Sequence, residues 1–251
     1  MLLDVETTGL DFENDRIIEI AAMVTTDDFT EVMQAINTYC WYDDYPKLTE
    51  EITALTGISM ENILDFHMST PVAIQNVLDM AAAHGCDTVI AYNAQFDEAM
   101  VSAEMRRWKM ESNLKWLCAM NDVESNRAFK CKKLSHLALD RGLVVDPKTL
   151  HRALGDVELM RRFLVSVCVT ASDLKAYREL PEIYITAYVA HPREGMKAEQ
   201  QRATAKTCGF SWEQARGDDS GRRFEKRWVK KIKQSDWDKE VAACPLKLAV
   251  I

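Results

Sequence analysis

The succession of hydrophobic patterns along the chain is the feature that most constrains its fold. Three runs near the N-terminus alternate apolar and polar side chains, at 2–6, 16–26 and 31–41. Such alternation is typical of strands, and the polar turn at 27–29 predicts that the runs form an antiparallel meander. The residues that follow have mainly helical spacing, interrupted by one short apolar run. Strands first, and then a strand among helices, predict an α/β fold with a mixed sheet flanked by helices.

The helices of this fold have recognisable ends in the sequence. Thr70 as an N-cap and Pro71 at the first helical position predict the start of one helix, and Gly85 predicts its end. Gly57 similarly predicts the end of an earlier, shorter helix. The predicted helices cover residues 48–59, 69–85, 94–108, 119–127, 132–141 and 151–170, and the short strand covers 87–93.

Length and composition are those of a soluble globular protein. The chain has 251 residues, of which 47% are hydrophobic and 28% charged, enough for a core domain of roughly 150 to 180 residues and a smaller module. Its apolar runs are shorter than the roughly 20 residues of a membrane span, and no charged-then-apolar leader precedes Leu2. We therefore expect a cytoplasmic protein with no membrane partner.

The cysteines do not suggest a disulfide framework or a zinc site. There are seven of them, an odd number, with no C-x-x-C pair and no close cluster with histidine. Reduced and mostly buried thiols fit this spacing best.

Charge divides the chain into two parts. Residues 172–251 carry 16 Lys and Arg against 12 Asp and Glu, whereas residues 1–171 carry 15 against 27. The sign changes near Pro181, so we predict one domain at 1–171 and a second, small α+β domain at 182–251. An acidic body that binds nucleic acid needs cations or a basic annex to offset phosphate repulsion.

Two carboxylates interrupt the first strand. Asp4 and Glu6 are two residues apart, so both side chains point to the same face beside apolar neighbours. A D-x-E pair can simply be a solvated strand end. In a partly dry site, however, two such groups resist joint ionisation unless a cation binds between them. The residues after this strand, Thr7-Thr8-Gly9, allow a sharp turn and leave hydroxyl and N–H groups facing outward.

A third carboxylate lies at the next strand-to-helix junction. Asp97 is in the first turn of the helix predicted at 94–108, where unpaired backbone N–H groups favour an anion. Asp97 can serve the helix start alone. Nearby, Asn93 can position a ligand and Phe96 can pack the turn, which favours a functional site.

The last acidic motif is H-x4-D, formed by His151 and Asp156. On one continuous helix, a separation of five residues places two side chains roughly 140° apart, on different faces. Both can reach one site if His151 precedes the helix and Asp156 lies in its first turns, with Gly155 allowing close approach.

Taken together, these motifs resemble the DEDDh family of 3′→5′ exonucleases, which has a DnaQ-like, ribonuclease-H-like fold. The matching segments are "DVETTG", "NAQFD" and H-x4-D, together with "LTGI" and a short strand in "WLCAMND". The resemblance covers residues 1 to about 170. A Tyr four residues before the last Asp would indicate the sister DEDDy group, but that position is Arg152.

The resemblance implies metal-dependent phosphodiester hydrolysis. It implies that two Mg²⁺ or Mn²⁺ ions, roughly 4 Å apart, bind Asp4, Glu6, Asp97 and Asp156. Independently, several converging carboxylates repel one another unless divalent, oxygen-seeking ions neutralise them. His151 would accept the proton of the attacking water. By position, the residues that contact the terminal nucleotide are Thr7, Thr8, Leu10, Asn93 and Phe96.

The C-terminal part is rich in both cations and aromatic residues, and it weakly resembles an accessory module found beside phage and bacterial nucleases. Such a composition suits stacking on single strands and contact with phosphates. Equally, the aromatic residues can be the core of a small domain and the cations its solvated face. The candidate nucleic-acid contacts are Arg222, Arg223, Trp228, Lys230 and Lys231.

The function predicted from these patterns is a free-standing exodeoxyribonuclease similar to exonuclease X and acting on single-stranded DNA 3′ ends. A trimming exoribonuclease is the alternative within nucleases, because the motifs do not report on the 2′-hydroxyl. A proofreading subunit bound to a polymerase is a third interpretation, ranked lower because the chain lacks a clamp-type Gln-x-x-Leu-x-Phe peptide. An inactive relative is disfavoured because all five motif residues are present.

Overall fold

The computed structural model describes residues 1–41, 48–123, 131–189, 196–214 and 226–250, and these residues form two compact units. The first unit spans Met1–Arg178 and the second spans Glu179–Ile251. The sequence analysis had placed the change at 171–182, so both boundaries fall in the same segment. Within the described ranges, none of the helices has the length and apolar character needed to cross a bilayer.

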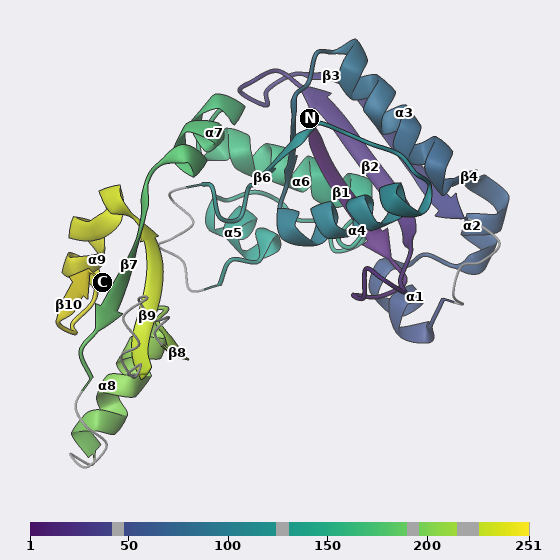
Figure 1. Cartoon of the computed structure of the whole chain (residues 1–251). Helices are drawn as coiled ribbons and strands as arrows, with labels where there is room; N and C mark the ends of the chain where they lie inside the picture. The colour runs from purple at the N-terminus through teal and green to yellow at the C-terminus, as the bar shows by residue number, and fades with distance from the viewer. Residues whose placement is uncertain (42–47, 124–130, 190–195, 215–225, 251) are drawn as a thin grey trace. The chain divides into compact units, whose positions relative to one another are not determined.

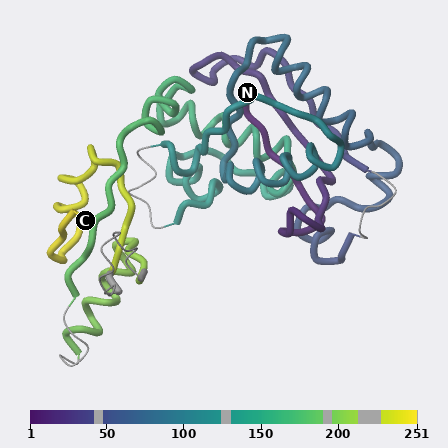
Figure 2. Tube along the Cα trace, viewed as in Figure 1, coloured from purple at the N-terminus to yellow at the C-terminus, as the bar shows by residue number. Residues whose placement is uncertain are grey.

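The first unit is built on a six-stranded mixed sheet in the order β4-β3-β2-β1-β5-β6 (Figures 1 and 2). β1 pairs antiparallel with β2 and parallel with β5, so the N-terminal strand lies in the interior of the sheet. The strands are β1 (Leu2–Thr7), β2 (Ile17–Thr25), β3 (Val32–Trp41), β4 (His67–Ser69), β5 (Thr88–Ala91) and β6 (Lys115–Cys118). This architecture confirms the predicted α/β, ribonuclease-H-like sheet with flanking helices.

Helices cover both faces of this sheet. Alternation along β1 sends Leu3 and Val5 into one core with α3 and α4, and sends Leu2 into the opposite core with α5 and α6. Asp4 and Glu6 therefore lie on the face covered by α6. The helices of this unit are α1 (Glu50–Thr56), α2 (Met60–Phe66), α3 (Thr70–Ala83), α4 (Ala94–Arg107), α5 (Leu134–Asp140), α6 (Ala153–Ser166) and α7 (Ala171–Glu179).

Most predicted elements are present, with differences at their ends. α1 ends at Gly57, which has φ +70° as expected of a left-handed cap. α3 begins one residue earlier than predicted, because Ser69 is its N-cap and Thr70 is already helical. Both α2 and β4 were missed, because no element was predicted for residues 60–68.

The helix predicted at 119–127 is wrong over its described residues, 119–123, which form a turn; residues 124–127 lie outside the described ranges. The backbone of Ala119 continues the pairing of β6 with β5 by donating to the carbonyl of Ala91. Asp122 then folds back, and its carboxylate accepts a hydrogen bond from the Cys118 N–H at 2.7 Å. Strand pairing and this side-chain contact thus replace the predicted helix.

The second unit is a four-stranded antiparallel sheet in the order β10-β7-β9-β8, with helices beside it. Its core includes Ile185, Phe210, Trp228 and Ile232. The elements are β7 (Glu182–Ala187), α8 (Met196–Thr207), β8 (Ser211–Gln214), β9 (Lys226–Lys233), a 3₁₀ turn (Gln234–Asp236), α9 (Trp237–Ala243) and β10 (Leu248–Val250). This is the α+β arrangement predicted for the C-terminal module.

Candidate active site

Three carboxylates from distant parts of the sequence converge on the α6 face of the sheet. One oxygen each from Asp4, Glu6 and Asp156 lies within 4.8 Å of the others. β1 supplies the first two, and the first turn of α6 supplies the third. Val157, next to Asp156, is fully buried in the same core as Leu2, so packing of α6 on β1 brings the acids together.

Asp97 joins this site from the opposite helix layer. It lies in the first turn of α4 and is 3% exposed. Its carboxylate accepts a hydrogen bond from the backbone N–H of Val5, between the two acids of β1, at 3.3 Å. Asp97 is outside the group of three within 4.8 Å, but it is close enough for its charge to raise the pKa of Asp4.

His151 lies just before α6, as the H-x4-D motif predicted. Its backbone is in the left-handed region with φ +57°, a conformation that ends any helical continuity with α6. Its N–H donates to a carboxylate oxygen of Asp156 at 3.1 Å, and its side chain is exposed. Gly155 permits this fold-back, because a Cβ there would lie 2.0 Å from the carbonyl oxygen of Thr149.

All four acids have raised pKa values, and at Asp4, Glu6 and Asp97 the charges of other acids in the site add to the effect of burial. Burial is the first cause at each of them, and it raises the pKa of Glu6 to about 8, of Asp97 to about 7 and of Asp156 to about 6. Burial also raises the pKa of Asp4 well above its ordinary range, with Asp97 and Asp156 as the next causes. His151 and its N–H bond oppose the shift at Asp156. A site that penalises its own negative charge in this way is suited to bind cations.

A fifth acid, Glu19 of β2, is cross-strand partner to Glu6 and is 1% exposed. It forms an ion pair with the guanidinium of Arg152, at 2.9 Å. Sequence analysis did not identify Glu19. The available signal was that Glu19 is the one charged residue in β2, whose other members up to Val24 are uncharged and buried.

With this geometry established, comparison with known proteins identifies the family. Residues 1–162 match the family described as Exonuclease and named RNase_T. The chain belongs to this exonuclease family. Membership confirms the resemblance to DEDDh exonucleases that the motifs predicted.

Curated relatives of this exonuclease chain include two proteins named Ribonuclease T. The one from Histophilus somni is 26% identical over 203 residues, which are 74% of this chain and 89% of the relative. The one from Haemophilus influenzae is 26% identical over 195 residues, 73% of this chain and 83% of the relative.

Solved structures share the fold of the exonuclease chain at low identity. The nuclease domain of 3′hExo, a DEDDh family member bound to rAMP, has a TM-score of 0.57 and 16% identity, covering 65% of this chain and 88% of that domain. Exonuclease I of E. coli in complex with a dT13 oligonucleotide has a TM-score of 0.60 and 14% identity. That match covers 99% of this chain and 64% of exonuclease I, so it includes the C-terminal unit.

The loop after β1 places two of the predicted substrate contacts inside the protein. Thr7 and Thr8 are buried; Thr7 donates to the carbonyl of Gly9, and Thr8 donates to Asp15 at 2.8 Å. This differs from the expectation that their hydroxyls face outward. A Cβ at Gly9 would lie 2.3 Å from the Asp15 carboxylate, so a larger residue there would displace the Asp15 side chain that accepts from Thr8. Leu10, in contrast, is 82% exposed.

The two remaining predicted contacts flank Asp97. Asn93 is the exposed N-cap residue of α4, and its side chain makes no capping hydrogen bond. Phe96 is partly buried and packs against the core formed with α3. The Asn93 side chain is therefore accessible to a ligand, whereas Phe96 mainly packs the turn against the core.

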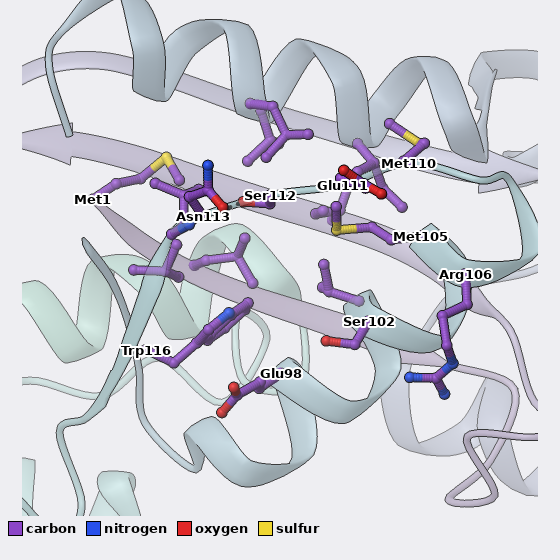
Figure 3. Close-up of a pocket in the computed structure, with 18 residues that line it drawn as sticks. Met1, Glu98, Ser102, Met105, Arg106, Met110, Glu111, Ser112, Asn113 and Trp116 are labelled. Carbon is purple, nitrogen blue, oxygen red and sulfur yellow. Dashed lines mark hydrogen bonds between the residues drawn. The ribbon is translucent and has the colours of Figure 1, made fainter. Parts of the chain in front are cut away.

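A separate pocket of about 460 Å³ lies on the other face of the sheet (Figure 3). Leu3, Val77 and Met105 contribute to its apolar wall, while Glu98 and Arg106 are among its polar residues. Because Leu3 and Asp4 point to opposite faces of β1, this pocket is distinct from the carboxylate site.

The described C-terminal candidates are already engaged within their own unit. Trp228 is 5% exposed and belongs to the core, so a stacking role for it is not supported by its position. Lys230 bonds both carboxylate oxygens of Glu240, at 2.6 and 2.7 Å, and Lys231 forms an ion pair with Glu182. The other two candidates, Arg222 and Arg223, lie outside the described residues.

Sequence reasoning did not single out the most exposed tryptophan of this unit. Trp212, on β8, is 53% exposed, and its ring lies 5.3 Å from that of Trp228 at an interplanar angle of 56°. β8 is an edge strand of the sheet. The Trp212 ring therefore packs at a tilt beside the core residue Trp228, and about half of Trp212 remains accessible.

Proposed function

We propose that this protein is a metal-dependent 3′→5′ exonuclease that acts on single-stranded DNA ends and releases nucleoside 5′-monophosphates. The observation that carries the proposal is the convergence of Asp4, Glu6 and Asp156 within 4.8 Å. Membership of the exonuclease family supports phosphodiester hydrolysis as the reaction. The similar structure of exonuclease I in complex with ssDNA supports single-stranded DNA as the substrate, and the relatives named Ribonuclease T support a nucleic acid more generally.

The residues of the site fit two divalent cations, Mg²⁺ or Mn²⁺. We assign Asp4, Glu6, Asp97 and Asp156 as the ligands, because carboxylate oxygen is the donor these ions prefer. The raised pKa values indicate that the acids lack sufficient positive charge among their neighbours. When bound, such ions supply an activated water and stabilise negative charge on the leaving oxygen.

His151 is the general base in this proposal. Its exposed imidazole can accept the proton of the attacking water, a role for which histidine is the commonest side chain. Asp156 fixes the His151 backbone through the 3.1 Å hydrogen bond, while it also serves as a metal ligand. This hydrogen bond therefore links the segment that carries the base directly to one of the acids.

Leu10 is the residue that contacts the terminal base in this proposal. Thr7 and Thr8 brace the loop that carries it, through bonds to Gly9 and Asp15. Asn93 lies beside Asp97 and contributes a polar contact to the terminal nucleotide. The 82% exposure of Leu10 leaves its side chain available for that base.

The C-terminal unit, in this proposal, is an accessory domain that binds the substrate strand. Its exposed Trp212 supports stacking on bases, and the surplus of cations after residue 171 supports contact with phosphates.

An exoribonuclease that trims RNA 3′ ends is the second candidate. The observation in its favour is that the curated relatives are named Ribonuclease T. Both candidates use the same carboxylates and the same base, so they differ only in the sugar that the site accepts.

Purified protein incubated with end-labelled oligonucleotides tests the proposal. Single- and double-stranded DNA and RNA would each be assayed with Mg²⁺, Mn²⁺ or EDTA, and the products resolved by length. We expect stepwise shortening from the 3′ end of single-stranded DNA. EDTA should abolish it, and so should the substitution Asp4→Asn, which removes a proposed ligand. Faster shortening of RNA would favour the second candidate. No shortening of any substrate with either ion would contradict both.

A further inference from the structure

The segment that carries His151 is attached to the sheet by an ion pair between the partly exposed Arg152 and the buried Glu19. Glu19 is 1% exposed in the middle of β2, directly opposite Glu6 of β1. Arg152 donates to its two carboxylate oxygens from Nε at 3.1 Å and from Nη2 at 2.9 Å. The pairing is a two-point fork, which fixes the orientation of both groups.

Two further contacts extend this pair into its surroundings. The backbone N–H of Ala153, the first residue of α6, donates to Glu19 at 3.0 Å. The guanidinium of Arg152 also donates to the hydroxyl of Tyr39 on β3 at 2.9 Å, and lies over the Tyr39 ring. Glu19 therefore anchors both the side chain before α6 and the helix start itself.

Arg152 is the only residue between His151 and α6. His151 is in the left-handed conformation, and its N–H is fixed by Asp156. A shift of Arg152 would therefore move the proposed base on one side and the ligand-bearing first turn of α6 on the other. Glu19 faces Glu6 across the pair of strands β1 and β2. The ion pair therefore also fixes the position of His151 and Asp156 relative to β1, which carries Asp4 and Glu6.

Glu19 itself is committed to protein donors. Both of its oxygens accept hydrogen bonds from Arg152 or Ala153, and within the described ranges none of the four proposed metal ligands forms such a fork with a guanidinium. This distinguishes it from the proposed metal ligands, although it lies next to one of them.

We propose that Glu19 and Arg152 are positioning residues that set His151 and Asp156 against the acids of β1. The inference rests on the proposed function, because it assigns the pair a role in that hydrolysis. Loss of the contacts that position a metal ligand and a base is expected to reduce activity or metal affinity by about 10- to 100-fold.

Four variants test the inference: Arg152→Lys, Arg152→Met, Glu19→Gln, and the double variant Glu19→Gln with Arg152→Met. Arg152→Met leaves the buried Glu19 charge without its partner, and Glu19→Gln leaves the partly exposed Arg152 without its own, so both variants should lose stability and Arg152→Met should lose more. The double variant removes both charges and should melt closer to the parent. A matched control on the same helix is Glu158→Gln with Arg161→Met, which removes another Arg–Glu pair outside the carboxylate site.

The readouts are the melting temperature, kcat and KM on a short oligonucleotide, and Mn²⁺ binding by calorimetry. We expect the double variant and Arg152→Lys to lose about 10- to 100-fold in kcat with little change in KM, and the double variant to bind Mn²⁺ about 10-fold more weakly. The control should keep the kcat, KM and Mn²⁺ affinity of the parent, although it also loses the hydrogen bonds of Arg161 to the carbonyls of Phe29 and Thr30 and can melt lower. A purely structural role predicts instead that activity and Mn²⁺ affinity recover together with the melting temperature.

The outcomes separate this inference from the function on which it rests. An active parent whose double variant keeps its kcat and Mn²⁺ affinity would overturn the inference alone. If the parent binds Mn²⁺ but degrades none of the nucleic acids tested, the Mn²⁺ affinities of the variants still decide the positioning role. A parent that neither binds Mn²⁺ nor degrades nucleic acid would overturn the proposed function and the inference with it.

Discussion

The carbonyl oxygen of Thr149 lies against Gly155, only 2.0 Å from the position that the Cβ of any larger residue would take there. Gly155 is in the first turn of α6, directly before Asp156. The segment leading to His151 can therefore fold back onto the helix only over a glycine.

Replacement of Gly155 by Ala should consequently displace His151 and reduce both stability and activity. The clash is with backbone, which cannot rotate away, so we expect a loss of about 1 to 3 kcal/mol in the free energy of unfolding. Denaturant unfolding and the oligonucleotide assay measure the two effects. Gly85→Asn is the control, because Gly85 has φ +67° with nothing near its Cβ position, and Asn tolerates that conformation. Full activity in Gly155→Ala would show that this close contact is not needed.

Neutral isosteres of the four acids should separate catalysis from stability. Asp4→Asn, Glu6→Gln, Asp97→Asn and Asp156→Asn each remove a proposed ligand, so hydrolysis should fall by orders of magnitude. The same changes relieve carboxylate repulsion, so the metal-free variants should melt at or above the parent temperature. A clear loss of melting temperature at any of these positions would point to a structural role there, and near-normal turnover would remove that residue from the site.

The raised pKa values predict how the metal-free protein responds to pH. Glu6, Asp97 and Asp156 retain protons in the folded state up to about pH 8, 7 and 6, whereas unfolded carboxyls lose them near pH 4. The folded state therefore binds more protons over this window, and its stability falls as pH rises through it. We expect the melting temperature in EDTA to drop by roughly 5 to 10 °C between pH 5 and pH 8.5.

Two comparisons check the origin of that drop. Excess Mg²⁺ should reduce it, because bound cations offset the repulsion, and Glu6→Gln should flatten the metal-free profile. A melting temperature that stays constant or rises over the same range in EDTA would contradict the assigned pKa directions.

Removal of the proposed base should affect chemistry without affecting metal binding. His151→Asn retains a residue that tolerates the left-handed backbone at φ +57° but cannot accept the proton. We expect the rate to fall by about 10²- to 10⁴-fold, with Mn²⁺ affinity by calorimetry close to that of the parent. Loss of a bound ion in this variant would instead assign His151 as a ligand.

The acids were predictable from the sequence through local rules and motif order together. Local rules place Asp4 and Glu6 on one strand face and Asp97 in the first turn of a helix, but each of these patterns alone also fits a structural role. The order and spacing of the three motifs, which resemble the DEDDh family, brought them together as one site. Glu19 was not predictable in the same way. Its partner Arg152 is 133 residues away, and only the register of β2 against β1 reveals that Glu19 faces Glu6.

The C-terminal unit shows the same limit for packing. Strand alternation alone does not tell which face of β9 is buried. The register that places Trp212 opposite Trp228 depends on how β8 and β9 pair in the folded unit, which the sequence pattern does not reveal. The hydroxyls of Thr7 and Thr8 are a further case, because their partners Gly9 and Asp15 become close only when the loop after β1 closes.

Trp212 and Trp228 should therefore respond differently to substitution by Ala. Trp228 is in the core, so Trp228→Ala should cost about 3 to 5 kcal/mol of stability in its unit. Trp212 is 53% exposed, so Trp212→Ala should leave the fold largely intact and weaken binding of long single strands by about 1 to 3 kcal/mol. Fluorescence titration with oligonucleotides at several salt concentrations measures the binding, and thermal unfolding measures the stability.

The salt dependence of binding gives a second test of the stacking role. Because stacking releases no counterions, the binding affinity of Trp212→Ala should fall with salt concentration at the same slope as that of the parent. Equal affinity of Trp212→Ala and the parent for long strands at every salt concentration would exclude Trp212 as a stacking surface and would favour a protein partner for that edge of the sheet.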